Sequence, residues 1–259
     1  MGIPAVSHVH SEWSYDGTWK LDELAREFSR RGYQVMLMTE HDRGFTQSRW
    51  MDYRRACREL SSDKMLVVPG IEYSDPENIV HILTWGNVPF LGENLPTRSV
   101  LEAVRNAGGV AVLAHPSRRK AWQRFDASWS EYLTGIEVWN RKTDGWRPSP
   151  DAPELLAAAA CHPFVGMDFH ERRQLFPLAM VLDCPMPLSH EVVLDCLRNR
   201  RCEPQAFDIA LKPGVRDVLQ ISLLPFETAR RGCRWIYRRT RTAGTRLPQI
   251  SPKPPRVNG

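Results

Sequence analysis

The sequence predicts an α/β protein, a distorted (β/α)7 TIM-like barrel with a basic C-terminal extension. Three observations lead to this fold class. Short apolar runs typical of buried strands alternate with amphipathic helical patterns along most of the chain. Histidine and acidic side chains recur where the apolar runs end, which is the edge at which α/β barrels gather catalytic groups. The length of 259 residues, with 42% hydrophobic and 25% charged residues, is sufficient for one large core.

The expected strands are short runs rich in valine, isoleucine, leucine and methionine. They span residues 5–8, 34–39, 65–68, 79–84, 110–114, 135–138, 164–167 and 179–182. The expected helices span residues 21–31, 50–60, 99–106, 153–160 and 190–198. The first helix has one apolar face, made by Leu21, Leu24, Ala25 and Phe28. The alternation predicts a mostly parallel sheet, and the number of repeats favours its closure into a barrel.

Charge separates the body of the chain from its C-terminal end. Residues 228–259 carry nine Arg and Lys and no acid, whereas residues 1–227 carry 26 basic and 30 acidic residues. We expect a barrel domain over 1–210, an extension over 211–243 with a short basic amphipathic helix, and a disordered tail over 244–259. The helix is expected because one face collects Phe226, Ala229, Cys233, Ile236 and Tyr237.

The N-terminus and the cysteines indicate the cellular compartment. No apolar run is long enough to cross a bilayer and no export signal is visible, so the sequence predicts a cytoplasmic protein. Six cysteines occur without a Cys-x-x-Cys pair, which argues against a thiolate zinc site and against a disulfide framework. We expect free and mostly buried thiols.

Six of the eight histidines occur in short motifs together with three acidic residues. This set comprises His8, His10, Asp16, His41, Glu72, His81, His115, Asp168 and His170. Five of its members, one for each of five different strands, lie at or just past a C-terminal strand end, where a barrel brings them together. His8 and His10 are two residues apart on a strand, so both should point to one side. Imidazole and carboxylate together suit zinc, manganese or iron.

The charge of such a site indicates a substrate class. Three divalent ions would bring six positive charges against the carboxylates of Asp16, Glu72 and Asp168, which leaves a positive pocket. A phosphate ester fits this pocket, because neighbouring ions can bridge a hydroxide for attack on phosphorus and neutralise the phosphoryl oxygens. The expected partner is therefore a small phosphorylated substrate.

Eight motifs follow one another in a characteristic order. They are His8-Val9-His10-Ser11, Ser14-Tyr15-Asp16-Gly17, Thr39-Glu40-His41-Asp42, Pro69-Gly70-Ile71-Glu72, Val80-His81-Ile82-Leu83, Ala114-His115-Pro116, Gly135-Ile136-Glu137-Val138 and Gly166-Met167-Asp168-Phe169-His170. In this order they resemble the PHP (polymerase and histidinol phosphatase) family over roughly residues 4–183. The resemblance implies a distorted barrel of seven βα units with a trinuclear metal site. It also implies phosphoester hydrolysis, which most free-standing members carry out.

The resemblance further implies how the ligands are shared among three divalent transition-metal ions. One ion would take His8, His10, Glu72 and Asp168, a second would share Glu72 with His81 and His115, and a third would take Asp16, His41 and His170. All nine positions are filled. The residues of the third set are those we expect to take part in catalysis.

The chain departs from the family pattern at two positions. Glu40 stands where the family usually has Asp, and Val6 stands where the family usually has an acidic residue. Both are expected beside the ligands, so they would alter metal affinity rather than remove the site.

Arg118 is the expected substrate-binding residue. It follows His115 at a spacing where some PHP phosphatases carry an arginine for the substrate phosphate, and a guanidinium can hold two phosphate oxygens. The adjacent Arg119 and Lys120 make a solvated charged face an equal alternative. Arg43 and Arg141 are weaker candidates.

Five further residues have other expected roles. Tyr73 and Trp139 are expected in the core, and His162 and His190 are expected to be structural. Glu137 has two possible roles, either supporting a ligand of the site or forming a buried pair elsewhere.

The sequence favours a metal-dependent phosphoesterase that hydrolyses a small phosphate monoester, either a metabolite or a nucleotide. The alternatives are an exonuclease or nucleic-acid phosphatase of the same family, served by the basic tail, and a non-catalytic metal-binding scaffold. An amidohydrolase-type barrel also begins with His-x-His but needs a bridging lysine after a middle strand, and none is expected here. Contact of the tail with nucleic acid or an anionic membrane is the less favoured role, and no obligate protein partner is predicted.

Overall fold

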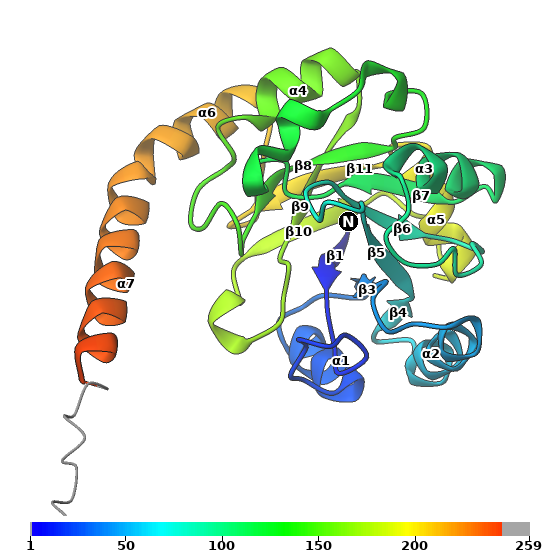
Figure 1. Cartoon of the computed structure of the whole chain (residues 1–259). Helices are drawn as coiled ribbons and strands as arrows, with labels where there is room; N and C mark the ends of the chain where they lie inside the picture. The colour runs from blue at the N-terminus through cyan, green and yellow to red at the C-terminus, as the bar shows by residue number, and fades with distance from the viewer. Residues whose placement is uncertain (1, 245–259) are drawn as a thin grey trace, which may run out of the picture.

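The computed structural model describes residues 2–244, with the strands at the centre and the helices around them (Figure 1). One six-stranded sheet has the order β12-β11-β10-β1-β2-β4. Its strands are β1 (Ile3–Val9), β2 (Val35–Met38), β4 (Leu66–Val68), β10 (Leu178–Leu182), β11 (Cys202–Ala206) and β12 (Ile209–Ala210). The other has the order β3-β5-β6-β7-β8-β9. Its strands are β3 (Glu40–His41), β5 (Gly70–Ser74), β6 (His81–Trp85), β7 (Val110–Leu113), β8 (Gly135–Asn140) and β9 (His162–Gly166).

The α/β class is confirmed, and the two sheets are joined on both sides. Only Thr39 separates β2 from β3, and only Pro69 separates β4 from β5. On the other side, the N–H of Phe169 donates to the His8 carbonyl at 3.0 Å and the N–H of His10 donates to the Phe169 carbonyl at 2.9 Å. Among the described residues the strand ladders do not close into one ring, so the barrel of seven βα units stays a prediction.

The expected mostly parallel sheet is wrong, because five of the ten neighbouring strand pairs are antiparallel. Residues 75–80 connect β5 to β6 and are too few for a crossover helix, so β6 returns alongside β5 in the opposite direction. Ser74 at the end of β5 is therefore paired with His81 at the start of β6. This reversal brings His81 to the same edge as Glu72.

Five helices lie where the sequence predicts them. They are α1 (Leu21–Arg30), α2 (Gln47–Leu60), α3 (Thr97–Asn106), α4 (Ala152–Ala159) and α5 (His190–Arg198), with short 3-10 turns at Arg118–Arg124, Ala127–Trp129 and Arg172–Gln174. The four residues of the expected apolar face of α1 are buried. Phe28 on this face packs edge-to-face on Phe169, with ring centres 5.4 Å apart, so α1 supports the junction of the sheets. All six cysteines are free and four are buried, as expected.

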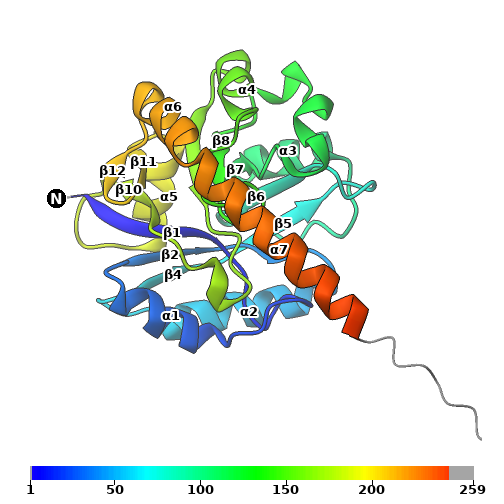
Figure 2. The same ribbon diagram turned by 90° about the vertical axis from the view of Figure 1, so that its left-hand side faces the viewer.

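The C-terminal extension is more helical than the sequence predicts. It consists of α6 (Pro213–Ser222) and α7 (Leu224–Gly244), and α7 runs along one side of the molecule and past its edge (Figures 1 and 2). The expected apolar face is not packed on the body, since Phe226, Ala229 and Cys233 are exposed. The side chains of Ile236 and Tyr237, and the tail expected beyond residue 244, lie outside the described residues, and the proposed domain limits stay a prediction. No helix within 2–244 has the length and apolar character needed to span a bilayer.

Candidate metal centre

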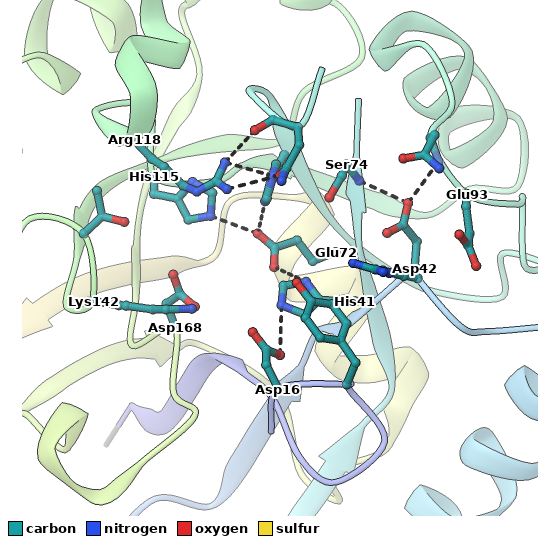
Figure 3. Close-up of a pocket in the computed structure, with 16 residues that line it drawn as sticks. Asp16, His41, Asp42, Glu72, Ser74, Glu93, His115, Arg118, Lys142 and Asp168 are labelled. Atoms are coloured by element: carbon teal, nitrogen blue, oxygen red, sulfur yellow. Dashed lines mark hydrogen bonds and ion pairs between the residues drawn. The ribbon is translucent and has the colours of Figure 1, made fainter. Parts of the chain in front are cut away.

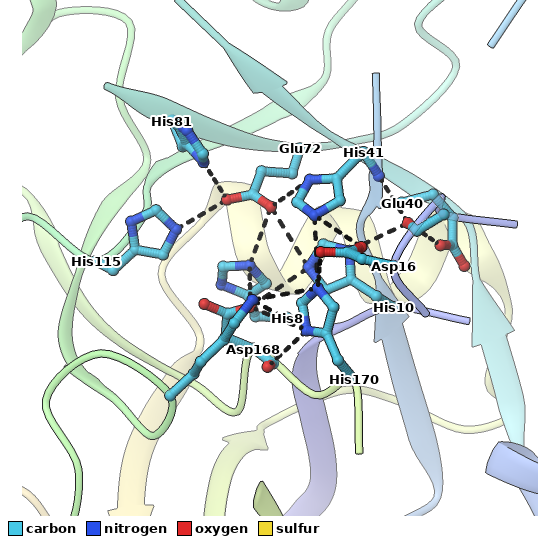
Figure 4. A network of polar contacts seen from close by, with 12 residues as sticks. His8, His10, Asp16, Glu40, His41, Glu72, His81, His115, Asp168 and His170 are labelled. Carbon is cyan, nitrogen blue, oxygen red and sulfur yellow. Dashed lines mark hydrogen bonds and ion pairs between the residues drawn. The ribbon is translucent and has the colours of Figure 1, made fainter. Parts of the chain in front are cut away.

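A cavity of about 440 Å³ opens at the edge where several strands of the second sheet end. Six of the nine expected ligands line it: Asp16, His41, Glu72, His81, His115 and Asp168 (Figure 3). His8, His10 and His170 are buried beside them (Figure 4). The structure thus brings all nine residues together from elements far apart in the sequence.

Glu72 is the centre of this cluster. Its Oε1 lies 2.7 Å from Nδ1 of His81 and 2.9 Å from Nε2 of His115. Its Oε2 lies 3.1 Å from Nδ1 of His41, 3.4 Å from Nε2 of His10 and 3.5 Å from Nε2 of His8. One carboxylate therefore faces five imidazoles, which suits a ligand that bridges two ions.

The other two carboxylates complete the cluster on either side. Oδ1 of Asp168 lies 3.8 Å and 3.7 Å from the Nε2 atoms of His8 and His10. The two oxygens of Asp16 lie 3.3 Å from His41 Nε2 and 3.2 Å from His170 Nε2. Ligand atoms of the triplets His10, His41, His170; His8, Glu72, His115; and His8, His10, Asp168 each lie within 4.8 Å of one another.

Three of these residues have an unusual backbone conformation. His8, His115 and Asp168 have φ angles of 59°, 26° and 47°, in the left-handed region that costs about 1 to 3 kcal/mol for such residues. At His8 the pairing of β1 with β2 shifts by a bulge. His8 and His10 do meet, with ring centres 5.2 Å apart, but the bulge rather than simple strand alternation orients them.

The buried polar atoms of the cluster fit bound cations. Nε2 of His8, Nε2 of His10, Oδ1 of Asp16 and Nδ1 of His115 are buried without a hydrogen-bond partner among the described residues. Leaving such atoms unpaired costs about 1 to 3 kcal/mol each. Imidazole nitrogens that face carboxylate oxygens without hydrogen-bonding to them are the donor set that divalent transition metals use.

The electrostatics of the cluster also favour positive charge. Burial alone would raise the pKa of Glu72, but His81 and His8 outweigh it and hold this pKa well below its usual range. Burial alone would lower the pKa of His41, but Asp16 and Glu72 raise it to about 10. The pKa of His10 is lowered by burial and by neighbouring imidazoles. The cluster therefore attracts protons or metal ions, and metal binding would release the protons.

Glu137, left open by the sequence, lies directly behind the ligands. Its Oε1 lies 2.8 Å from Nδ1 of His8, and its Oε2 accepts the N–H of His115 at 2.7 Å and the amide of Asn140 at 2.9 Å. A carboxylate on the far nitrogen of an imidazole holds the ring in place and raises its basicity as a ligand. Gly166 makes room for this carboxylate, since a Cβ there would collide with Oε1 of Glu137.

Glu40 lies in a similar supporting position. It accepts hydrogen bonds from the N–H of Ser11 and from the hydroxyls of Ser11 and Ser14. The Ser14 hydroxyl lies 3.3 Å from Nδ1 of His10. Glu40 thus organises the loop before Asp16 and does not contact the carboxylates of the cluster. Val6, the other departure, is fully buried in the hydrophobic core.

Lys142 is a site residue that sequence reasoning missed. It follows β8 by two residues, and its Nζ lies 3.1 Å from Oδ1 of Asp168 and 3.2 Å from Nε2 of His170. The sequence predicts no bridging lysine on a middle strand, and Lys142 lies in the turn that follows the end of β8 at Asn140. The sequence predicts that this strand ends at Val138, and its two further residues bring the chain to Lys142.

The remaining candidates divide between the cavity and the core. Arg118 lines the cavity, and its Nη1 donates to the Asn78 carbonyl at 2.9 Å and lies 3.1 Å from Nε2 of His81. Arg43 lines the cavity as well and lies over the ring of Tyr15, 5.2 Å from its centre. Tyr73 and Trp139 are buried in the core as expected, and Arg141 points to a different cavity.

No protein-family model and no curated protein matches this chain by sequence. A two-domain protein from Bacteroides vulgatus containing a predicted PHP-like metal-dependent phosphoesterase matches with a TM-score of 0.61 and 16% identity, over 81% of this chain and 66% of its own. This chain thus spans just under two thirds of that protein.

Two further solved structures have a similar fold. PsfC from Pseudomonas syringae matches with a TM-score of 0.58 and 13% identity, over 86% of this chain and 100% of its own. The lesion-specific endonuclease PfuEndoQ from Pyrococcus furiosus matches with a TM-score of 0.56 and 12% identity, over 77% of this chain and 56% of its own. These likenesses show that this chain shares its fold with the three solved structures.

Proposed function

We propose that the protein is a metal-dependent hydrolase that cleaves a small phosphate monoester. The observation that carries this proposal is the cluster of six imidazoles and three carboxylates, with unpaired buried donor atoms, at the base of an open cavity. Burying so many titratable groups without a cation would be very costly. The likeness in fold to the Bacteroides vulgatus protein, which contains a predicted PHP-like metal-dependent phosphoesterase, supports the same class of reaction.

The contacts around Glu72 support three groups of ligands for zinc, manganese or iron. The groups are His8, His10, Glu72 and Asp168; Glu72, His81 and His115; and Asp16, His41 and His170. Bound divalent ions supply Lewis acidity, which lowers the pKa of coordinated water and withdraws charge from phosphoryl oxygens. Glu137 and Ser14 hold His8 and His10 in place for this role.

Three cationic side chains around the cavity would bind the substrate phosphate. Arg118, Arg43 and Lys142 come from three separate segments and all line the cavity. The guanidinium of Arg118 would exchange its contacts to Asn78 for two phosphate oxygens, which orients the ester without taking part in bond cleavage. Lys142 neutralises charge beside Asp168.

A nuclease is the second candidate, because PfuEndoQ shares the fold and further arginines lie beside the cavity. In that function the same groups would bind a backbone phosphate. A non-catalytic scaffold has less support, since all nine expected ligands are present and in contact.

The proposed function is tested by phosphate release from a panel of monoesters, nucleotides and short oligonucleotides, with protein reconstituted in manganese, zinc or iron. His170→Ala should abolish turnover. His162→Ala is the matched control and should retain it, because His162 bonds to the Cys202 carbonyl away from the cavity. Turnover of a small monoester supports the proposal, cleavage of oligonucleotides alone favours the nuclease, and no release with any metal overturns both.

A further inference from the structure

A second cavity of about 360 Å³ adjoins the metal centre. It lies between the segment after β8, the turn at Arg172–Gln174 and helix α7, and we call it the α7 cavity. The charged residues of its wall are Arg141, Lys142, Glu171, Arg173, Arg230 and Arg234. Five of these six are cationic. Lys142 also lines the metal-centre cavity, so the two cavities are neighbours.

Arg141 is the residue that most needs an anion. Arg141 is only 8% exposed, and its guanidinium lies over the rings of Phe176 and Trp146, 5.1 Å and 6.0 Å from their centres. Nη2 donates to the Arg173 carbonyl at 3.2 Å, and Nε is buried without a partner. No carboxylate among the described residues forms an ion pair with it. A buried charge without a counter-ion is costly, and a bound anion removes that cost.

The neighbours of Arg141 add to the positive charge. Burial and the nearby Arg230 and Arg234 lower the pKa of Arg141 to about 10, against the opposing effect of Glu227. Glu227 is engaged by Arg230 and Arg231, and Glu171 is engaged by Arg173. The carboxylates of this region therefore compensate other arginines and leave Arg141 uncompensated.

Helix α7 is attached so that it forms one wall of this cavity. Glu227 is buried and accepts the N–H of Trp146 at 3.0 Å. Gly145 lies against its carboxylate with φ of 84°, a position where a Cβ would collide with Glu227. This contact fixes the start of α7 on the segment that also carries Arg141 and Lys142.

We propose that the α7 cavity binds a second phosphate group of the substrate whose scissile phosphate lies in the metal centre. This inference rests on the proposed function and narrows its substrate class to phosphate esters that carry a further phosphate. Arginine is the side chain best suited to the recognition, because its planar donors match phosphate oxygens. Lys142 lies between the two phosphate positions. A small bisphosphate and a short nucleotide chain share this chemistry.

The first test compares substrates that differ by one phosphate. Thymidine 5′-monophosphate, thymidine 3′,5′-bisphosphate and a 5′-phosphorylated dinucleotide are assayed with the metal-loaded full chain. We expect kcat/KM to be at least about tenfold higher for one of the two larger substrates, and which one shows whether a small bisphosphate or a nucleotide chain is preferred. Arg141→Gln should reduce this preference about tenfold, whereas Arg26→Gln on the exposed face of α1 should retain it. Equal kcat/KM for all three substrates would overturn the inference.

The second test measures binding without turnover. Calorimetric titration with inorganic phosphate should show one more phosphate bound per chain in the wild type than in Arg141→Gln. Arg234→Gln, at an exposed position of α7, is a second variant in case Arg141→Gln does not fold, and it should weaken the same binding event. An equal number of phosphates in all three proteins rejects the α7 cavity. If the wild type hydrolyses no ester, the proposed function fails while this titration still decides the inference.

Discussion

The metal centre and the C-terminal helix pair place their charges in opposite ways. In the centre, nine titratable side chains are packed together, seven of them are no more than 6% exposed, and three have left-handed backbone angles. Among the described side chains of α7, Arg231 and Arg234 are exposed, Arg230 is half-buried, and Glu227 is buried. In the centre, side chains from both sheets and from the turn that carries Asp16 contact one another, whereas the start of α7 is attached through the buried Glu227, which accepts the N–H of Trp146.

The two regions should respond differently to substitution. A ligand in the centre contacts several others, so its removal affects the whole cluster. A residue on α7 acts through the Glu227 contact or through the α7 cavity, so its removal affects one function. Variants of matched chemistry in the two regions should therefore differ by orders of magnitude.

The largest effect is expected from Glu72→Gln. This variant keeps the shape of the side chain but removes the charge that faces five imidazoles. We expect kcat/KM for phosphoester hydrolysis to fall by at least about a thousandfold, comparable to the loss of a main electrostatic group. Steady-state kinetics with saturating metal measures it. Glu77→Gln, which removes an exposed pair with Arg124, should leave kcat/KM unchanged. Activity within tenfold of wild type in Glu72→Gln would contradict the central role of this residue.

Metal removal should have the next largest effect, this time on stability. Ions that bind the folded centre at a hundred times their Kd add about 2.7 kcal/mol to the free energy of unfolding, which corresponds to a rise in Tm of about 5 to 10 °C. Calorimetry with and without a chelator measures the change. The same treatment of Glu72→Gln should give a smaller shift. An identical Tm in wild type with metal and with chelator would show that the cluster does not bind ions.

Glu137→Gln should weaken metal binding without removing a ligand. The change weakens the contact that orients His8, and losses of this kind lower metal affinity by about 10- to 100-fold. Gly166→Ala should act in the same direction, because the added Cβ displaces the Glu137 carboxylate. Competition with a chelating dye gives the affinities. If both variants bind metal as tightly as wild type, Glu137 forms a buried pair with His8 that has no effect on metal binding.

The smallest effect is expected from Glu227→Gln on α7. Burial alone would raise the pKa of Glu227, but hydrogen bonds from Arg230, Arg231 and the N–H of Trp146 lower it to about 2. Its stabilising contribution is therefore complete above the ordinary value near 4.5 and is lost as pH falls toward 2. After allowance for solvent screening we expect about 1 kcal/mol, or about fivefold faster amide exchange in α7 at pH 7.

Amide exchange of wild type and Glu227→Gln, compared at the same pH, tests whether the stabilising contribution of Glu227 is lost as pH falls. The difference between them should shrink from pH 7 to pH 3. Phe226→Ser is the matched control on the same helix, because Phe226 is 61% exposed and its loss should change stability by less than about 0.5 kcal/mol. A difference that grows on acidification would contradict the role of Glu227.

The clustering of the candidate ligands could be predicted from the sequence, and their binding of metal ions stays a prediction. His8, Glu72 and Asp168 occur in ordered motifs at strand ends, and the contacts among all nine expected ligands agree with that expectation. The α/β class and the buried face of α1 could be predicted for the same reason, since periodicity records which side chains face the core. Short strands such as β3 and β12, each two residues long, carry too little pattern to be found.

The supporting contacts and the surroundings were decided only by the tertiary structure. Lys142 enters the site after β8 ends at Asn140, and Glu137 reaches His8 because Gly166 leaves space for its carboxylate. His81 is an expected ligand, but it reaches Glu72 because β6 runs antiparallel to β5, which the sequence did not predict. The α7 cavity needs Arg141 and Arg234, which are 93 positions apart in the sequence. Local pattern determines which residues can form strands and bind ions, because these properties depend on side-chain type and spacing. Which distant residues meet depends on strand direction and packing, and these are determined by the whole chain.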